Sequence, residues 1–438
     1  MRRRQVLGLG VALAVLGGTG SVRAAGRDTV AQKVLDTWLR LTLELIRHTP
    51  TYTPPVASRT LAYLGIAAFE ALVTGDPALR SLSGQLNGLP PLPDRAPGQP
   101  YDTAVILNAV LDPLVHAFFA NTGPTGQHAM QTLTGRLADQ SGADVAPDVV
   151  AASRSYGATL AAAILAWADG DGGAAVENLG FPRDWTLNPA PGHWKPTSRI
   201  SLQQAPLLPD WGRNRTFAMP AGDSCALPPP TPYSEEPGSP FHDQALQVYS
   251  TAKSLTPEQT HIARFWSDDA MLSFTPPGHW TAVLGQIAAE QGLDLTTQVE
   301  ALARMTVAMA DAFIGCWAVK YQYDLLRPVT YIKAHIDKAW EPLLNTPPFP
   351  EYPSGHSTQS AAAAAVLTAQ FGADFAFSDQ SPTPDGVKPR SFASFDAAAD
   401  EAAISRLYGG IHFMPAITQG QAQGRCIAAH AIALRTRA

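Results

Sequence analysis

Most of this chain repeats apolar residues at the spacing of amphipathic helices. Between Val30 and Ile46 the apolar side chains recur every three or four positions, which is the period of one helix face. The longest such pattern runs up to Pro328, a helix stop signal. Strand alternation is nearly absent, so we expect an all-α protein. Other segments with the helical pattern are residues 57–75, 101–120, 146–173 and 241–270.

Residues 172–242 break this pattern. The segment is rich in Pro, Gly and Trp, and a long irregular segment is normally either a linker or a packed functional wall. Its tryptophans, Trp185, Trp194 and Trp211, favour a packed wall over disorder. Residues 372–379 are too short a stretch to assign.

Composition narrows the class of protein. The 438 residues are 45% hydrophobic and 16% charged, which gives room for two cores or one large lobed core. A net charge of −6, with no basic tract beyond the N-terminus, argues against a nucleic-acid partner. Cys225, Cys316 and Cys426 are widely spaced and indicate neither a disulfide framework nor a zinc site. One bridge could form after export, and the odd count leaves at least one thiol free.

The N-terminus has the features of an export signal. Three arginines precede a short apolar run, and small residues lead to an expected cleavage near Ala24 or Ala25. The run is short and Gly-rich for a membrane span. RRRQVLGLG resembles a twin-arginine signal, with a general secretory signal as the alternative. We therefore expect residues 1–25 to be removed, leaving a periplasmic or secreted protein with no membrane span.

Two cations lie near the end of the longest predicted helix. Lys320 and Arg327 are seven positions apart, a spacing that returns to nearly the same face of a helix. Their neighbours are apolar, and a buried pair of cations needs an anion, although a solvated basic face is the commoner arrangement. Because Pro328 disfavours helix at the preceding residue, Arg327 is expected at the helix end.

A Pro-rich approach then delivers Ser354, Gly355 and His356 to the start of an alanine-rich helix. Glycine lets the backbone approach a ligand closely, and the free N–H groups of a helix N-terminus bind anions. Ser354 adds a hydroxyl, and His356 can exchange protons near neutral pH. A helix cap beside a structural histidine is the simpler alternative to a site for a tetrahedral anion.

The third polar block is SRLYGGIHF, residues 405–413. Arg406 and His412 are six positions apart and would point in different directions on an unbroken helix. Gly409 and Gly410 are expected to break the helix, so that both side chains reach one centre. Either histidine alone would more often be structural, but three cations, a Ser-Gly donor and two histidines together favour one anion site.

The pattern Lys-x6-Arg-Pro, Pro-Ser-Gly-His and Ser-Arg-x5-His resembles the vanadium-dependent haloperoxidases. These share an oxyanion site with the type-2 phosphatidic acid phosphatase superfamily. Weaker similarity extends upstream through PPVASRTLAYLGIAAFEA, PGHWKPT, LLPDWG and TPPGHW. The resemblance implies an all-α fold built on two four-helix bundles. It makes residues 26–438 one family domain, with the motifs in the half from 256 to 438.

The resemblance also implies a cofactor, a reaction and residue roles. Vanadate would be the cofactor, and phosphate could occupy the same site. His412 would bind the vanadium axially, and His356 would hydrogen-bond the opposite apical oxygen and move protons. The enzyme would use hydrogen peroxide to oxidise chloride or bromide to a hypohalous acid equivalent, which reacts with a small organic acceptor; the metal acts as a Lewis acid. The groups expected to hold the equatorial oxygens belong to Lys320, Arg327, Ser354, Gly355 and Arg406.

This sequence departs from the family at one position. Ala416 stands where many members carry an acid four residues after the last histidine, so we expect His412 to lack an orienting carboxylate, with a backbone carbonyl as a substitute. Asp268 and Asp269 are candidates to pair with a site arginine, or else are exposed acids at a helix end. Phe349 matches an aromatic position of the chloroperoxidases but does not settle the halide.

Two other functions fit the same residues. In an acid phosphatase, His412 would attack phosphorus to form a phosphohistidine, and His356 would protonate the leaving group. A protein that binds an oxyanion without turnover is the third reading. Chain length favours the peroxidase, because the simple acid phosphatases of this superfamily are much shorter. The organic substrate and a homo-oligomeric state are left open.

Overall fold

The computed structural model describes residues 18–438 apart from 183–184, 199–202 and 383–384, with side chains described from residue 26 onward. Helix α1 (Gly18–His48) therefore begins inside the expected signal segment, most of which lies outside the described residues. The removal of residues 1–25 stays a prediction.

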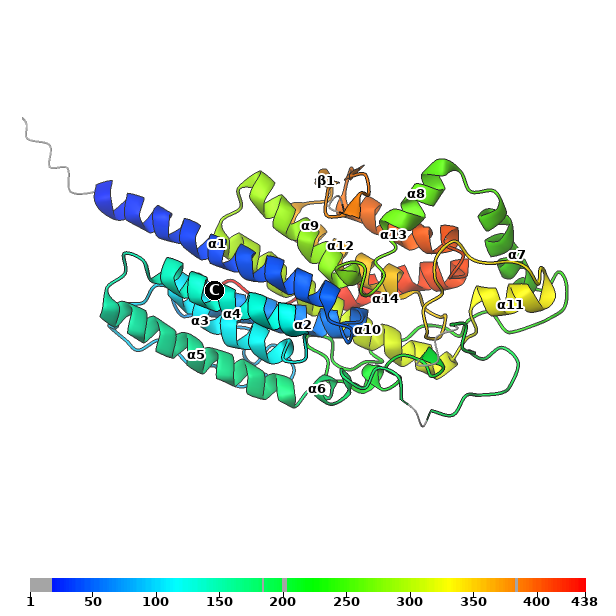
Figure 1. The fold of residues 1–438 in the computed structure, drawn as a ribbon, viewed down its shortest axis with the longest axis horizontal. Helices are drawn as coiled ribbons and strands as arrows, with labels where there is room; N and C mark the ends of the chain where they lie inside the picture. The colour runs from blue at the N-terminus through cyan, green and yellow to red at the C-terminus, as the bar shows by residue number, and fades with distance from the viewer. Residues whose placement is uncertain (1–17, 183–184, 199–202, 383–384) are drawn as a thin grey trace, which may run out of the picture.

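Helices from the N-terminal half form a first bundle at one end of the molecule (Figure 1). Proline at the first turn begins α2, α4 and α5, where its missing N–H costs no helical bond. The sequence pattern did not indicate α4, which buries little besides Met130, Leu133 and Leu137. The elements of this half after α1 are α2 (Pro54–Val73), α3 (Thr103–Phe118), α4 (Pro124–Gly142), α5 (Pro147–Asp169) and the short α6 (Gly173–Val176).

A second bundle occupies the other end and is built from the C-terminal half (Figure 1). Its main helices are α9 (Thr275–Gln291), α10 (Leu295–Tyr323), α12 (Gly355–Phe371), α13 (Phe395–Tyr408) and α14 (Met414–Ile432). Shorter elements beside it are the 3₁₀ turn η2 (Trp211–Arg213), α7 (Pro240–Lys253), α8 (Pro257–Phe265) and α11 (Pro328–His335). The unassigned stretch contributes β1 (Phe377–Asp379), which pairs antiparallel with β2 (Arg390–Phe392). The prediction of an all-α fold is confirmed.

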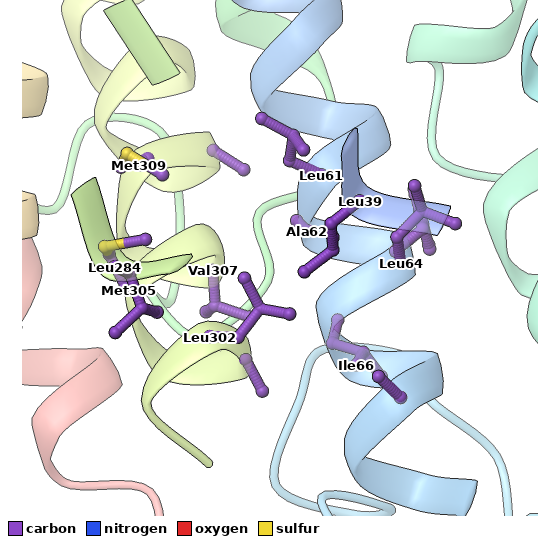
Figure 2. Packing of buried hydrophobic residues seen from close by; sticks show 14 of the residues in the cluster. Leu39, Leu61, Ala62, Leu64, Ile66, Leu284, Leu302, Met305, Val307 and Met309 are labelled. Carbon is purple, nitrogen blue, oxygen red and sulfur yellow. The ribbon is translucent and has the colours of Figure 1, made fainter. Parts of the chain in front are cut away.

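Helices α2 and α10 join the two bundles. Figure 2 shows Leu61 and Ala62 of α2 facing Leu302 and Val307 of α10 across a mostly apolar contact. The helices approach closely because Gly65 has no side chain: a Cβ there would lie 2.5 Å from Oγ1 of Thr306. The two bundles therefore share one continuous core.

Three helices in the described part of the chain are long and apolar enough to cross a membrane, namely α2, α5 and α10. The apolar window is 100% buried within the protein in α2 and 89% buried in α10, against 33% in α5. Burial among other helices therefore accounts for the apolar character of α2 and α10.

The longest helix ends earlier than its sequence pattern predicts. α10 ends at Tyr323, and Asp324 caps it in the left-handed conformation (φ 48°), donating its N–H to the carbonyl of Lys320. Pro328 does not stop this helix but begins α11, with Arg327 as the N-cap residue. The argument that Lys320 and Arg327 share one helix face was therefore wrong, and a turn brings them together instead.

The described parts of the Pro- and Trp-rich segment form a packed wall, as expected, although Trp185 is 38% exposed. Trp194 and Trp211 are buried in it. The carboxylate of Asp311 in α10 accepts the N–H groups of residues 217, 218 and 219 at 2.6–2.8 Å, which fixes the segment to the second bundle. A disulfide between Cys225 and Cys426 ties the same segment to α14, while Cys316 is a buried free thiol.

Candidate functional site

A cavity of about 610 Å³ lies at the end of the second bundle. Its walls are largely apolar and include Phe313, Trp317 and Phe349. Among the groups that line it are four from the blocks singled out in the sequence, namely Gly355, His356, Arg406 and His412. The structure thus brings helix α12 and the α13–α14 turn to one cavity. As expected, α13 ends before Gly409, and Gly410 (φ 76°) turns the chain.

His412 lies just before α14, buried, with both ring nitrogens engaged. Nδ1 is 2.8 Å from Oε1 of Glu351, and Nε2 is 3.1 Å from Nη1 of Arg327. A carboxylate accepts and an arginine donates, so Nδ1 carries the proton and Nε2 presents its lone pair. Burial lowers the pKa of His412 well below its usual value, and the charges of Arg327 and Lys320 lower it further. The ring is therefore neutral, the form that ligates metals.

Glu351 is a functional residue that the sequence reading missed. The expectation that His412 lacks an orienting carboxylate was wrong, because Glu351 supplies one from the loop before α12. Its Oε1 also accepts the N–H of Phe413 at 2.8 Å. Ala416 instead offers its carbonyl to the N–H of Ser354 at 3.0 Å. The available signal was the acid inside PPFPEYPSGH, an unusual residue in a buried apolar loop.

Burial raises the pKa of Glu351 to about 7, and the charge of Arg327 and the N–H of Phe413 oppose that shift. Because Oε1 already accepts the N–H of Phe413, a proton on this carboxyl group would sit on Oε2, and Oε1 stays the acceptor for Nδ1 of His412. Its other oxygen, Oε2, is buried and has no hydrogen-bond partner in the described part of the chain.

Arg327 is buried beneath the cavity and is only partly satisfied. Its Nε donates to the carbonyl of Phe349 (2.8 Å), and its Nη1 donates to the carbonyl of Ile411 (3.0 Å). Its Nη2 is buried and has no hydrogen-bond partner among the described residues. Burial lowers the pKa of this guanidinium to about 10, so it stays charged at neutral pH. A buried cationic donor without an acceptor is costly, and an anion at this position would remove that cost.

Lys320 is placed differently from its expected role. Its Nζ donates to the carbonyls of Pro350 (2.8 Å), Glu351 (3.0 Å) and Pro353. Burial lowers its pKa to about 7, but three carbonyl acceptors require the three donors of an ammonium group. In this structure Lys320 therefore holds the loop before Ser354 and contributes positive charge from behind the cavity.

Ser354 and Gly355 begin α12 as predicted. Ser354 is the N-cap residue, and its Oγ accepts from the N–H (3.3 Å) and hydroxyl (2.8 Å) of Ser357. A Cβ on Gly355 would meet only Phe313 and Trp317, each at the ordinary distance of 3.7 Å. Glycine is thus not required by the protein's own packing, and the space it leaves opens into the cavity.

Arg406 and His356 form the opposite side of the site. Nη1 of Arg406 lies 3.3 Å from Nε2 of His356, so that ring nitrogen is also an acceptor. Arg406 is otherwise held by Oγ of Ser405 (2.9 Å) and by the carbonyl of Trp266. Burial and the charge of Arg406 lower the pKa of His356 well below its usual value. Both site histidines are therefore neutral, each with Nε2 facing an arginine.

The two acids before α9 differ from their expected role. Neither makes an ion pair with Arg406 within 4 Å, although both lie on the cavity and their charges act on that guanidinium. Asp268 instead contacts the buried His279, and its Oδ2 lies 3.9 Å from Nε2 of His356. No role was expected for His279 from the sequence pattern.

The donor set fits a vanadate-sized oxyanion. Cationic donors converge from Arg327 and Arg406, Lys320 adds charge, and the N-terminus of α12 faces the cavity. The unpartnered Nη2 of Arg327 and the lone pair on Nε2 of His412 are what an oxyanion with a metal centre would engage.

Comparisons with known proteins agree with this geometry. Residues 300–438 match the family model of the VCPO second helical-bundle domain. The vanadium chloroperoxidase of Curvularia inaequalis is 30% identical over 139 residues, a match covering 26% of this chain and 22% of that protein. The chain thus aligns with well under two thirds of that relative's length.

Solved structures extend the match to nearly the whole chain. A bacterial vanadium-dependent iodoperoxidase is 34% identical, with a TM-score of 0.84 over 93% of this chain and 97% of its own. A bacterial vanadium-dependent chloroperoxidase in its apo form shares the fold, with a TM-score of 0.67 at 13% identity over 87% of this chain and 93% of its own. The chain therefore belongs to the vanadium-dependent haloperoxidase family.

Proposed function

We propose that this protein is a vanadate-dependent haloperoxidase that uses hydrogen peroxide to oxidise a halide to a hypohalous acid equivalent. The observation that carries the proposal is the buried, unpartnered Nη2 of Arg327 beside the neutral, carboxylate-oriented ring of His412. Bound vanadate would supply the Lewis-acid centre at which peroxide becomes reactive toward halide.

The chain's own residues would bind the anion and move protons. Arg327, Arg406 and the N–H of Gly355 would bind anion oxygens, and the Nε2 of His412 would hold the vanadium. Glu351 keeps the proton of His412 on Nδ1, so that Nε2 stays unprotonated and could bind the metal in place of its contact with Nη1 of Arg327. Nε2 of His356, now facing Arg406, would take up and return protons at the cavity side of the anion. The apolar walls exclude water from these groups.

Iodide, bromide and chloride all belong in the first test. The relatives are named as an iodoperoxidase and a chloroperoxidase, so they do not agree on one halide. Phe349 contacts the guanidinium of Arg327, with its ring centre 4.8 Å from Cζ, and forms part of the cavity wall. A small organic acceptor would enter through the same cavity.

The decisive experiment pairs two assays on one preparation. Vanadate-loaded protein is given hydrogen peroxide, each halide and a phenol probe, and vanadate-free protein is given a simple phosphate ester. We expect halogenated phenol and negligible phosphate release. Phosphate release without halogenation would overturn the proposal in favour of the acid phosphatase, in which His412 attacks phosphorus. Tight vanadate binding with neither activity would leave only an oxyanion-binding protein.

Two substitutions separate the site histidines. His412→Ala removes the group that would hold the vanadium, so vanadate affinity should fall sharply and halogenation should vanish. His356→Ala leaves the arginines and His412 in place, so vanadate should still bind while halogenation is largely lost. Calorimetry with vanadate and halogenation rates measure both effects. Loss of binding in His356→Ala with normal binding in His412→Ala would reverse the assigned roles.

We also propose that the protein is exported by the twin-arginine route. Arg2 to Arg4 precede the short apolar run, and a disulfide is favoured in an oxidising compartment. Replacing the three arginines with lysines should leave the protein in the cytoplasm, as cell fractionation would show. Unchanged export would assign the segment to the general secretory route.

A further inference from the structure

His279 is clamped between two carboxylates below the cavity. Its Nδ1 lies 2.9 and 3.1 Å from the two carboxylate oxygens of Asp268, and its Nε2 lies 2.8 Å from Oδ2 of Asp379. All three side chains are buried. The ring also stacks on Trp266, with centroids 4.7 Å apart. The motif TPPGHW thus places a histidine of α9 between the α8–α9 loop and β1.

With both acids ionised, hydrogen-bond geometry assigns the protons of this cluster. Both ring nitrogens face carboxylate oxygens, which only accept when ionised, so the ring must donate from both nitrogens. The cluster is therefore an imidazolium between two carboxylates. Burial alone would lower the pKa of His279, but Asp268 and Asp379 together raise it well above its usual value. Asp379 is held in turn by the N–H and hydroxyl of Ser381 at 2.9 and 2.6 Å.

The clamp reaches the proposed active site through Asp268. This residue has a left-handed backbone (φ 49°), a conformation that needs support from its surroundings. Its Oδ2 lies 3.9 Å from Nε2 of His356. Burial and the charges of Arg406 in α13 and His279 in α9 lower the pKa of His356, and backbone hydrogen bonds with residues 266 and 267 oppose that shift. Asp268 from the loop lies beside the ring, and His356 in turn acts on His412 in the α13–α14 turn.

We propose that His279 is a positioning residue: locked between Asp268 and Asp379, it holds the Asp268 carboxylate beside His356 and so sets the orientation and proton affinity of that ring. This inference rests on the proposed function, in which His356 moves protons. The hydrogen bonds of His279 go to Asp268 and Asp379, neither of which is expected to bind vanadate, so its effect is separable from binding of the anion.

The first test measures the protonation state of His279 and does not depend on enzyme activity. In full-length mature protein free of vanadate, labelled with ¹⁵N-histidine, His279 should show two protonated ring nitrogens well above neutral pH. Its signals are identified by their loss in His279→Gln. A ring that loses one proton near the ordinary value of about 6.5 would overturn the clamp. This result is independent of whether the protein halogenates.

The second test changes the charge of each partner in the contact between His279 and Asp268, in opposite directions. His279→Gln removes a positive charge and should raise the proton affinity of His356. The acidic limb of the pH–rate profile for halogenation should therefore move to higher pH. Asp268→Asn removes a negative charge and should move that limb to lower pH. Both variants should lose roughly ten- to a hundred-fold in kcat with vanadate affinity retained. The double variant should lose less than the product of the two single losses, because one contact is removed twice.

The matched control is His193→Gln, which removes another histidine–aspartate pair, His193 with Asp324 at 3.2 Å, away from the cavity. This variant should change neither the pH of the acidic limb nor kcat. If His279→Gln does not fold, Asp379→Asn removes the outer carboxylate and should reproduce the loss in kcat. Limbs that move the same way in His279→Gln and Asp268→Asn, or unchanged kcat in both, would overturn the proposal. If the wild type binds vanadate without halogenating, the proposed function fails while the ¹⁵N result still decides the clamp.

Discussion

Two buried glutamates show how one residue type serves different purposes in this protein. Burial raises the pKa of both Glu351 and Glu70 to about 7. Glu351 orients His412, whereas Glu70 accepts from the N–H of Leu82 (2.7 Å) and the hydroxyl of Ser81 (2.9 Å) in the first bundle. Because their burial and pKa are alike, each is a control for the other.

Glu351→Gln should weaken vanadate binding by roughly ten- to a hundred-fold, since an amide no longer fixes the Nδ1 proton of His412. Phosphate binding should weaken less, because phosphate would rely on the arginines and not on a bond to His412. Calorimetry with the two anions measures the difference. Glu70→Gln should leave both affinities unchanged, and equal losses for vanadate in the two variants would show a general effect of stability.

Glu70 also predicts a pH dependence of stability. Its folded pKa of about 7 lies above its ordinary value of 4.5, so the folded protein keeps a proton that the unfolded chain releases. The stability that this proton contributes is complete below pH 4.5 and is lost as pH rises through about 7. Urea unfolding should show a shallower decline across this window in Glu70→Gln than in the wild type. Parallel curves of stability against pH in the two proteins would contradict the raised pKa of Glu70.

At the scale of elements, close packing of α12 on α14 positions the anion site. A Cβ on Gly424 would lie 2.1 Å from the carbonyl oxygen of Thr358, and one on Gly420 would lie 2.9 Å from the carbonyl oxygen of Ser354. The alanine run of α12 has the same effect from the other side, since its small side chains are mostly buried there. The motif residues are thus held by glycine and alanine positions that carry no chemistry.

Gly424→Ala should therefore destabilise the protein by about 1–3 kcal/mol and weaken vanadate binding, because α14 must move away from the start of α12. Thermal unfolding and calorimetry measure the two effects. Gly285→Ala is the matched control: it lies in α9, a Cβ there meets nothing within 4 Å, and alanine favours helix by up to about 1 kcal/mol. A Gly424→Ala protein as stable as the control variant would contradict this account of the packing.

At the scale of the whole molecule, the disulfide links parts of the chain that are 201 residues apart. It joins the Pro- and Trp-rich wall to α14, and with the Asp311 contacts it holds an irregular segment against the second bundle. A crosslink that closes so long a loop restricts the unfolded chain strongly.

Replacing both Cys225 and Cys426 with serine should lower the free energy of unfolding by about 3–5 kcal/mol. Denaturant unfolding measures the loss, and reductant should lower the stability of the wild type but not of the variant. Thiol titration of the denatured, non-reduced wild type should find one thiol, that of Cys316. Three reactive thiols would exclude the bridge.

The sequence alone determined the helical class, the blocks that carry the site and the turn at Gly409 and Gly410. These features are local: helical periodicity, helix start signals and glycine conformation all act within a few residues. Ser354, Gly355, His356, Arg406 and His412 could be named because their blocks have recognisable order and spacing.

Only the tertiary structure decided which groups meet. Glu351 reaches His412 across 61 positions, Asp379 reaches His279 across 100, and Cys225 finds Cys426 across 201. Lys320 turned to loop carbonyls because a buried ammonium takes the acceptors that surround it, and its sequence neighbours do not reveal them. Partners of this kind follow from how helices pack, and packing depends on the whole chain whereas periodicity depends on one turn of helix.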